Sequence, residues 1–247
     1  MKAHPSSRAA VPLLLLLALL AALVIGLPHA GPLFGALFPQ LERPLYVQEP
    51  FAWLLWQHSL LAGVSSLAAV VVGSAIGVGV TRAGGQPFRA MAENVVAIGQ
   101  SIPPVAVLAL SVPIMGFGEL PALLALSVYG LLPVVQGTIG GLQTVPPSQI
   151  NAATGLGLSP WQCLRYIQIP LALPVWLAGV RTSVIINIST AAIASTVGAK
   201  TLGSPIIVGL GGFNTAYVLQ GALLVALLAV VVDAAFELLS KRLQWPT

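Results

Sequence analysis

The sequence predicts an all-α integral membrane protein with about six transmembrane helices. Three observations support this fold class: 57% of the 247 residues are hydrophobic, only 6% are charged, and the mean hydropathy is +0.96. A soluble domain carries about 25% charged residues, so this chain has too few charges to keep a folded surface in water. The net charge of +4 comes without a basic cluster beyond Lys241 and Arg242, which gives no indication of nucleic-acid binding.

Each spanning helix needs about 20 mostly apolar residues, and six segments of the chain meet this requirement. With approximate boundaries they are residues 11–27, 58–81, 91–114, 120–142, 171–198 and 216–239. Prolines interrupt the third and fourth segments, among them Pro103, Pro104 and Pro133. Because neighbouring helices can satisfy the backbone groups that a proline frees, we expect a packed bundle with kinks.

The first segment has two interpretations. A basic start and small residues near Ala30 fit a cleaved signal peptide, whereas an apolar core of 17 residues exceeds the about 7–15 residues usual for one. The longer core favours a retained helix. Residues 28–57 follow, and their apolar content together with Trp53 and Trp56 predicts a short amphipathic helix along the outer membrane surface.

The basic residues are distributed unevenly between the two sides of the predicted membrane topology. With a cytoplasmic amino terminus, the basic residues on the inner side are Lys2, Arg8, Arg82, Arg89, Arg165, Lys241 and Arg242. Only Arg43 and Lys200 fall outside. Short cytoplasmic segments carry an excess of Lys and Arg, so we expect both termini and residues 146–170 in the cytoplasm.

Arg181 is a charge about ten residues into the fifth predicted span. A charge at this depth costs several kcal/mol unless it is paired or reached by water. Its candidate partners are Glu93, Asp233 and Glu237, all on the inner half in this topology. A structural ion pair and a role in coupling or in the substrate path both remain open.

Other polar residues lie within the predicted spans. Asn187, Ser189 and Thr190 follow Arg181, and Gln100 with Ser101 precedes the double proline of the third span. They either line a translocation path or pack between helices. Glycines repeat at i, i+4 spacing at Gly73 and Gly77, and again at Gly137 and Gly141; such pairs let helix backbones approach closely in membranes.

The sequence lacks the patterns of metalloprotease, serine hydrolase and phosphate-loop sites. His4, His29 and His58 are far apart, and Cys163 has no second thiol nearby, so we expect no metal, cofactor or enzymatic centre. No acidic residue is predicted near the bilayer midplane, where a proton- or sodium-driven carrier usually needs one or else has paired broken helices. If the chain moves a solute, the energy is therefore expected from another subunit.

Residues 146–170 form a polar segment between two spans. Pro147 fits a first helical position and Gly155 a stop, while Ser159 and Pro160 fit the start of a second short helix. In this second helix we expect Trp161, Leu164 and Ile167 to share one face, and Pro170 to end the helix before the chain re-enters the bilayer. Two short helices joined at a glycine pivot would form a docking surface for a cytosolic partner.

This segment resembles the "EAA" loop of ABC-transporter permease subunits. The family pattern is Glu-Ala-Ala, three residues, Gly, nine residues, then Ile-x-Leu-Pro. Here the pattern stands as Asn151-Ala152-Ala153, Gly157 and Ile167-Gln168-Ile169-Pro170, with both gaps of the expected length. The resemblance implies an ATPase-coupling loop whose residues are Asn151, Ala152, Ala153, Gly155, Gly157, Arg165, Ile167 and Pro170. Asn151 stands where the family has Glu, which removes a charge near the ATPase.

The chain from about Trp56 to its end resembles the osmoprotectant branch of that family, which imports glycine betaine, choline and carnitine. The stretches that carry this resemblance are "GQSIPPVAVLAL", "PLALPVWLAGVRTSVIINIST", "STVGAKTLGSPIIVGL" and "GFNTAYVLQGALLVALLAVVVD". The resemblance implies a type I ABC importer permease in a bacterial inner membrane. It also implies a cytosolic ATP-binding subunit, a second permease chain, and an extracytoplasmic binding protein that supplies the solute.

The expected organisation is a first helix and outer segment (1–56), a permease domain (57–239) that contains the coupling loop (146–170), and a short cytoplasmic tail (240–247). Two alternatives remain open from the residues alone. One is a permease of the same class for another small solute such as an amino acid, and the other is a carrier that works without ATP.

Overall fold

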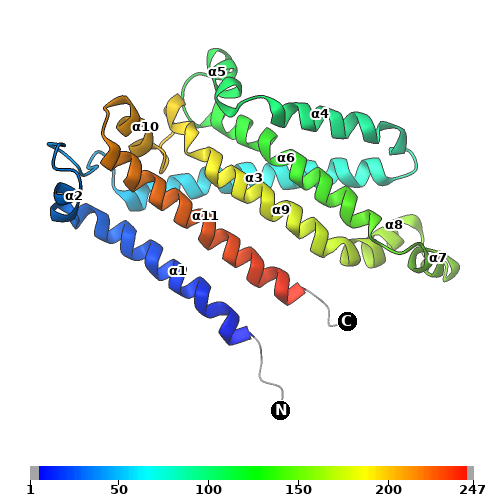
Figure 1. Ribbon diagram of the computed structural model, residues 1–247. Helices are drawn as coiled ribbons and strands as arrows, with labels where there is room; N and C mark the ends of the chain where they lie inside the picture. Colours follow the sequence, from blue (N-terminus) through cyan, green and yellow to red (C-terminus); the bar gives the residue numbers. More distant parts are fainter. Residues whose placement is uncertain (1–5, 244–247) are drawn as a thin grey trace.

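The computed structural model describes residues 6–243, with burial described from residue 10 onward. Its α-helices, in chain order, are α1 (Ser6–Gly26), α2 (Gly31–Leu37), α3 (Phe51–Thr81), α4 (Arg89–Ser101), α5 (Pro104–Met115), α6 (Glu119–Gln143), α7 (Pro147–Gly155), α8 (Pro160–Cys163), α9 (Ile169–Ala191), α10 (Ser204–Gly211) and α11 (Thr215–Leu243). Short 3₁₀ helices cover Leu27–His29, Gln86–Phe88 and Ile193–Val197. Figure 1 shows the long helices side by side, with α7 and α8 projecting at one end of the bundle and α2 and α10 at the other.

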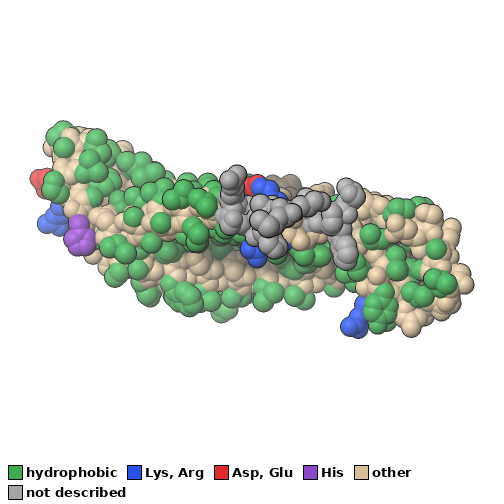
Figure 2. All heavy atoms as spheres, turned by 90° about the horizontal axis from the view of Figure 1, so that it is seen from below, with side chains coloured by type: hydrophobic (Ala, Val, Ile, Leu, Met, Phe, Trp, Pro, Cys, Tyr) green, Lys and Arg blue, Asp and Glu red, His purple; other side chains and the backbone are tan. Residues whose placement is uncertain are grey.

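Within the described residues, five helices are long and apolar enough to cross a membrane, and a bent helix pair brings the number to six if it counts as one span. This agrees with the six predicted spans. Figure 2 shows one face of the molecule, over most of which hydrophobic side chains and backbone predominate and Lys, Arg, Asp and Glu are few. Lys2, which is predicted to be cytoplasmic, and residues 244–247 of the predicted tail lie outside the described part of the chain.

The third predicted span is the bent pair, because α4 and α5 meet at 90°. Ile102 and Pro103 between them have extended backbone, with ψ of 129° and 137°. Each precedes a proline, whose ring disfavours helical backbone in the residue before it. The predicted kink is confirmed: the span consists of two helices that meet at the double proline. The fourth span, α6, continues through Pro133 without a break.

The centre of the bundle is formed by α3, α6 and α9, which pack along one another. The predicted glycine pairs lie in these contacts. A Cβ at Gly73 would be 3.0 Å from Val134 Cβ, and one at Gly77 would be 2.5 Å from Thr138 Cβ. Along α6 and α9, a Cβ at Gly137 would be 2.9 Å from the Cα of Gly179. The helix-packing interpretation is therefore confirmed.

The segment after α1 is held at the end of the bundle that carries α2 and α10. Its helix α2 has only seven residues, and an irregular strap continues over residues 38–50. Gln220 of α11 accepts a hydrogen bond from the Tyr46 amide (3.2 Å) and donates one to the Pro44 carbonyl (2.7 Å). Lys200 pairs with Glu49 at 2.5 Å. The predicted amphipathic helix over residues 28–57 is thus the short helix α2 followed by a strap. The last residues of the predicted segment belong to α3, which already starts at Phe51.

The fifth predicted span is longer at its start than expected. The chain is helical from Pro160 to Ala191 without interruption, so Pro170 does not end a separate short helix, and that prediction is wrong. Residues Leu164–Gln168 form a π-helical turn just before it. The wider turn accommodates a residue that lacks an N–H and whose ring would clash with a carbonyl in a regular α-helix.

Candidate functional site

The segment 146–170 forms two helical pieces joined by a tight turn at one end of the bundle (Figure 1). Helix α7 covers Pro147–Gly155, as the proline and glycine signals predict. The turn after it is closed by two hydrogen bonds, from Leu158 N–H to the Ala153 carbonyl (3.1 Å) and from Gly157 N–H to the Thr154 carbonyl (2.9 Å). This is a Schellman motif, whose left-handed position favours glycine. Gly157 occupies it, with φ +85°.

The second helical piece starts at a capping box. Ser159 accepts a hydrogen bond from the Gln162 amide, and the Gln162 side chain accepts one from the Ser159 amide. Such a reciprocal pair satisfies two backbone donors that a helix start leaves free. A Cβ at Gly155 would have nothing within 4 Å, and Gly155 has no positive φ, so of the two glycines only Gly157 has a backbone conformation that favours glycine. The predicted helix start at Pro160 is confirmed.

The side chains of this loop divide into exposed and buried groups. Asn151 and Ala152 are exposed on α7, whereas Ala153 is buried. Leu164 is 2% exposed and Trp161 66% exposed, so the apolar face predicted for Trp161, Leu164 and Ile167 is not a single surface. Arg165 is exposed, and its guanidinium lies 5.8 Å from the Tyr166 ring centroid.

The loop also presents large apolar side chains that the sequence patterns did not single out. Leu156 is 82% exposed and Tyr166 61% exposed. Together with Trp161 they form the exposed apolar part of the loop. For Leu156 the sequence signal was available, because an apolar residue between two helix ends has no neighbouring element to pack against, but helical periodicity does not report on such a position.

Arg181 is paired with Asp233 of α11. Its Nε and Nη2 donate to the two carboxylate oxygens at 2.6 Å each. Of the two other candidate partners, Glu93 binds Arg89 (2.9 Å) and Glu237 binds Lys241 (2.5 Å). A bidentate Arg–carboxylate pair offsets the cost of placing either charge among spanning helices. This geometry supports the interpretation of Arg181 as one half of a structural ion pair.

Asn187 is fully buried where α3, α6 and α9 meet. With its amide oriented to satisfy both ends, it donates to the Leu126 carbonyl (2.8 Å) and accepts from the Ser66 hydroxyl (3.0 Å). A Cβ at Gly130 would lie 3.0 Å from the same amide, so the site is tightly packed. In this structure Asn187 links helices and does not face an open channel.

The remaining polar candidates do not meet in one place. Gln100 donates to the Tyr129 carbonyl of α6 at 3.2 Å. The Ser101 hydroxyl bonds back to Ile98 within α4. Ser189 is exposed and Thr190 half-buried at the end of α9. Whether any of them lines a translocation path stays a prediction.

Comparison with known proteins identifies the family. Residues 69–245 match the model of the binding-protein-dependent transport system inner membrane component. The chain is 36% identical over 196 residues to the osmoprotectant import permease protein OsmY of Salmonella typhimurium, covering 79% of this chain and 83% of the relative. It is 31% identical over 186 residues to the glycine betaine/carnitine/choline transport system permease protein OpuCB of Bacillus subtilis, covering 75% and 85%.

Among solved structures, the inward-facing MetNI methionine ABC transporter matches with a TM-score of 0.69 and 25% identity, over 81% of this chain and all of that one. The architecture described above is therefore that of a type I ABC importer permease, as the sequence predicts. The chain belongs to the family of binding-protein-dependent transport system inner membrane components.

Proposed function

We propose that this chain is the permease subunit of an ATP-driven importer for osmoprotectants such as glycine betaine. The observation that carries the substrate class is its 31–36% identity, over about three quarters of its length, to permeases named for osmoprotectant, carnitine or choline transport. In this proposal the chain hydrolyses no ATP itself. It provides half of the translocation path and transmits the movement of a separate cytosolic ATPase.

The proposed contact with the ATPase is the loop 146–170. Its two helices are fixed in relative direction by the Schellman turn and the capping box, so the loop can move as a unit. Asn151 stands where the family pattern has an acidic Glu, so this charge is absent from the loop. The exposed side chains of Leu156, Trp161 and Tyr166 provide apolar contact area instead. Docking through apolar contacts and hydrogen bonds follows from this composition.

The proposed topology places the loop, the start of α1 and the end of α11 on the cytoplasmic side. All three lie toward the same end of the bundle (Figure 1). The opposite end carries the strap 38–50 and α10, and this end is where an extracytoplasmic binding protein would deliver the solute. The proposed division of the chain remains 1–56, 57–239 and 240–247, with α11 extending to Leu243.

A second candidate is an amino-acid permease of the same class. The similarity to the MetNI methionine transporter favours it, but at 25% identity that similarity is weaker than the one to the osmoprotectant permeases. The loop does not discriminate between the two, because it faces the ATPase in both.

Uptake of labelled glycine betaine into vesicles tests the substrate class. The vesicles contain the chain with its ATPase, and uptake is measured with and without ATP and the binding protein. We expect uptake that requires both and that unlabelled methionine does not inhibit. Uptake without ATP would instead indicate a secondary carrier, and inhibition by methionine would indicate the amino-acid alternative. Repeating the measurement across osmolalities would show whether transport is osmotically regulated.

The role of the loop is tested with a glycine pair. Gly157→Ala forces a side chain into the left-handed region, at a cost of about 1–2 kcal/mol, although nothing lies within 4 Å of its Cβ position. We expect normal membrane insertion with fewer solutes imported per ATP hydrolysed. Gly84→Ala, in the turn after α3 and equally unobstructed, is the matched control outside the loop and should transport normally. The same number of solutes imported per ATP hydrolysed in both variants would contradict the proposed role of the turn.

A further inference from the structure

Arg82 is a cation without an acidic partner. It follows the last residue of α3, and its Nη2 donates to the Gln168 side chain at 2.9 Å and to Thr81 Oγ1 at 3.4 Å. None of the ion pairs formed within residues 10–243 includes it, and its Nε is buried with no hydrogen-bond partner. Burial lowers the pKa of the guanidinium, yet arginine remains charged at neutral pH. Its Nε is therefore a buried donor that lacks an acceptor, on a side chain that is itself half-buried.

Arg82 lines a cavity of about 450 Å³ beside the ends of α3 and α6, and Gln168 and Ile150 of α7 also line it. The cavity also contains Arg89, whose Nε binds Glu93 while its Nη2 makes a long contact of 3.4 Å with Gln143. Two guanidinium groups and the side-chain amides of three glutamines thus line it, whereas no Asp or Glu is among its lining residues. Such a donor set suits a phosphate group.

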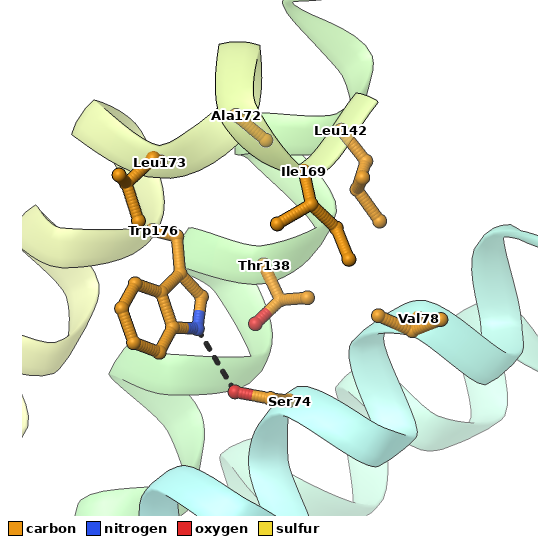
Figure 3. Close-up of a pocket in the computed structure, with 8 residues that line it drawn as sticks. All are labelled: Ser74, Val78, Thr138, Leu142, Ile169, Ala172, Leu173 and Trp176. Carbon is orange, nitrogen blue, oxygen red and sulfur yellow. Dashed lines mark hydrogen bonds between the residues drawn. The ribbon is translucent and has the colours of Figure 1, made fainter. Parts of the chain in front are cut away.

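A second, apolar cavity adjoins the first. It holds about 260 Å³ between α3, α6 and α9, and Leu142 lines both cavities. Figure 3 shows Val78, Leu142 and Ile169 at one end of it, and the hydrogen bond of 2.9 Å from Trp176 Nε1 to Ser74 Oγ at the other. Gln168 of the basic cavity is the chain neighbour of Ile169. The basic cavity and the apolar cavity are therefore neighbours, which meet at Leu142.

We propose that these two cavities together bind one anionic phospholipid, with its phosphate at Arg82 and Arg89 and part of an acyl chain between α3, α6 and α9. The depth of the site agrees with this occupant. Thr81 and Gln143 are the last residues of α3 and α6, so the basic cavity beside them lies at the level of the headgroups. The apolar cavity reaches Ser74 and Trp176, further along the spanning helices, and so lies within the hydrocarbon region. Basic pockets between spanning helices are known to receive lipid headgroups.

Two other occupants would use the same basic cavity. Free inorganic phosphate would satisfy the arginines but leave the apolar cavity unexplained. An acidic side chain of the ATPase could reach Arg82 from the cytoplasmic side, since Ile150 of α7 lines the same cavity. A phospholipid accounts for both cavities with one molecule, which is why we favour it.

Lipid retention by the purified transporter complex tests the proposal. The complex is delipidated in detergent, titrated with phosphatidylglycerol or phosphatidylcholine, and analysed by native mass spectrometry. We expect one phosphatidylglycerol per permease chain, retained over phosphatidylcholine. Arg82→Gln should weaken this retention about fivefold, the effect of one basic residue near a lipid surface. Arg242→Gln, which removes an exposed arginine at the end of α11, is the matched control and should leave it unchanged.

A second variant tests the apolar part without changing charge. Val78→Phe fills the cavity that would hold the acyl chain, and we expect it to weaken retention as well. Equal retention in wild type, Arg82→Gln and Val78→Phe would overturn the proposal. So would displacement of the lipid by inorganic phosphate at millimolar concentration, or a loss of ATPase association in Arg82→Gln without any change in lipid. These readouts do not depend on which solute is transported.

Discussion

The contact between α3 and α6 at Gly77 leads to a prediction about the stability of the bundle. In Gly77→Ala the new Cβ would lie 2.5 Å from Thr138 Cβ, 2.8 Å from Thr138 Cγ2 and 3.2 Å from the Val135 carbonyl oxygen. Carbon atoms pack at about 3.5–4.0 Å. The two helices must therefore separate by about 1 Å at this point.

Moving α3 and α6 apart at Gly77 also affects a neighbouring contact between the two helices. Gly73, one turn earlier on α3, also lies close to α6, since a Cβ there would be 3.0 Å from Val134 Cβ. Moving the helices apart therefore also loosens this neighbouring contact. Overpacking in a well-packed core costs about 1–3 kcal/mol. For a chain of this size, about 2 kcal/mol corresponds to a decrease in Tm of about 4–8 °C.

Thermal unfolding of the purified chain in detergent measures this change. Gly79→Ala is the matched control, since Gly79 lies on the same helix with nothing within 4 Å of its Cβ position, and its Tm should stay within about 1 °C of wild type or rise. The double variant Gly77→Ala with Thr138→Gly transfers the glycine to the facing helix and should recover part of the loss. Equal Tm values for Gly77→Ala and Gly79→Ala would refute the close-approach argument.

Two further predictions concern the ion pairs. Arg181→Gln leaves Asp233 unpaired among spanning helices, which should lower the free energy of unfolding by about 3 kcal/mol. We therefore expect less folded protein in size-exclusion profiles, and partial recovery when Asp233→Asn is added. Normal assembly with lost uptake would instead show a role in transport. Although burial alone would raise the pKa of Glu49, hydrogen bonds from Lys200 and Tyr46 hold it below its ordinary value of 4.5. A lowered pKa contributes stability at neutral pH that is lost as the pH falls through the folded-state value. The difference in Tm between wild type and Glu49→Gln should therefore persist from pH 7 to about 5 and shrink below that range; a difference that grows in acid would contradict it.

Local signals in the sequence predicted those features that depend on a few neighbouring residues. The capping residue Ser159, the start of α7 at Pro147 and the turn at Gly157 follow from the backbone preferences of these residue types. The glycine pairs of α3 and α6 follow from the need for close approach where hydrophobic driving force is absent. Each of these depends on spacing along the chain alone.

Features that depend on contacts between distant segments were not determined by the sequence patterns. Arg181 had three candidate partners, and the choice of Asp233 depends on the relative register of α9 and α11. Asn187 fitted both a path and a packing role, and its burial depends on Ser66 and Leu126, which belong to other helices. Pro170 was misinterpreted for a different reason, because a π-helical turn can absorb a proline that would otherwise end a helix.

The uninterrupted helix from Pro160 to Ala191 has a mechanical consequence. Gly179 is a point where its backbone lies close to α6, since a Cβ there would be 2.5 Å from the Pro133 carbonyl oxygen. This contact divides the helix into arms of about 28 Å toward Pro160 and about 18 Å toward Ala191, at 1.5 Å per residue. If the helix tilts as a unit about Gly179, a displacement of its Pro160 end reappears at its Ala191 end in the opposite direction and at about two thirds of its size. Closing one end of the bundle would then open the other.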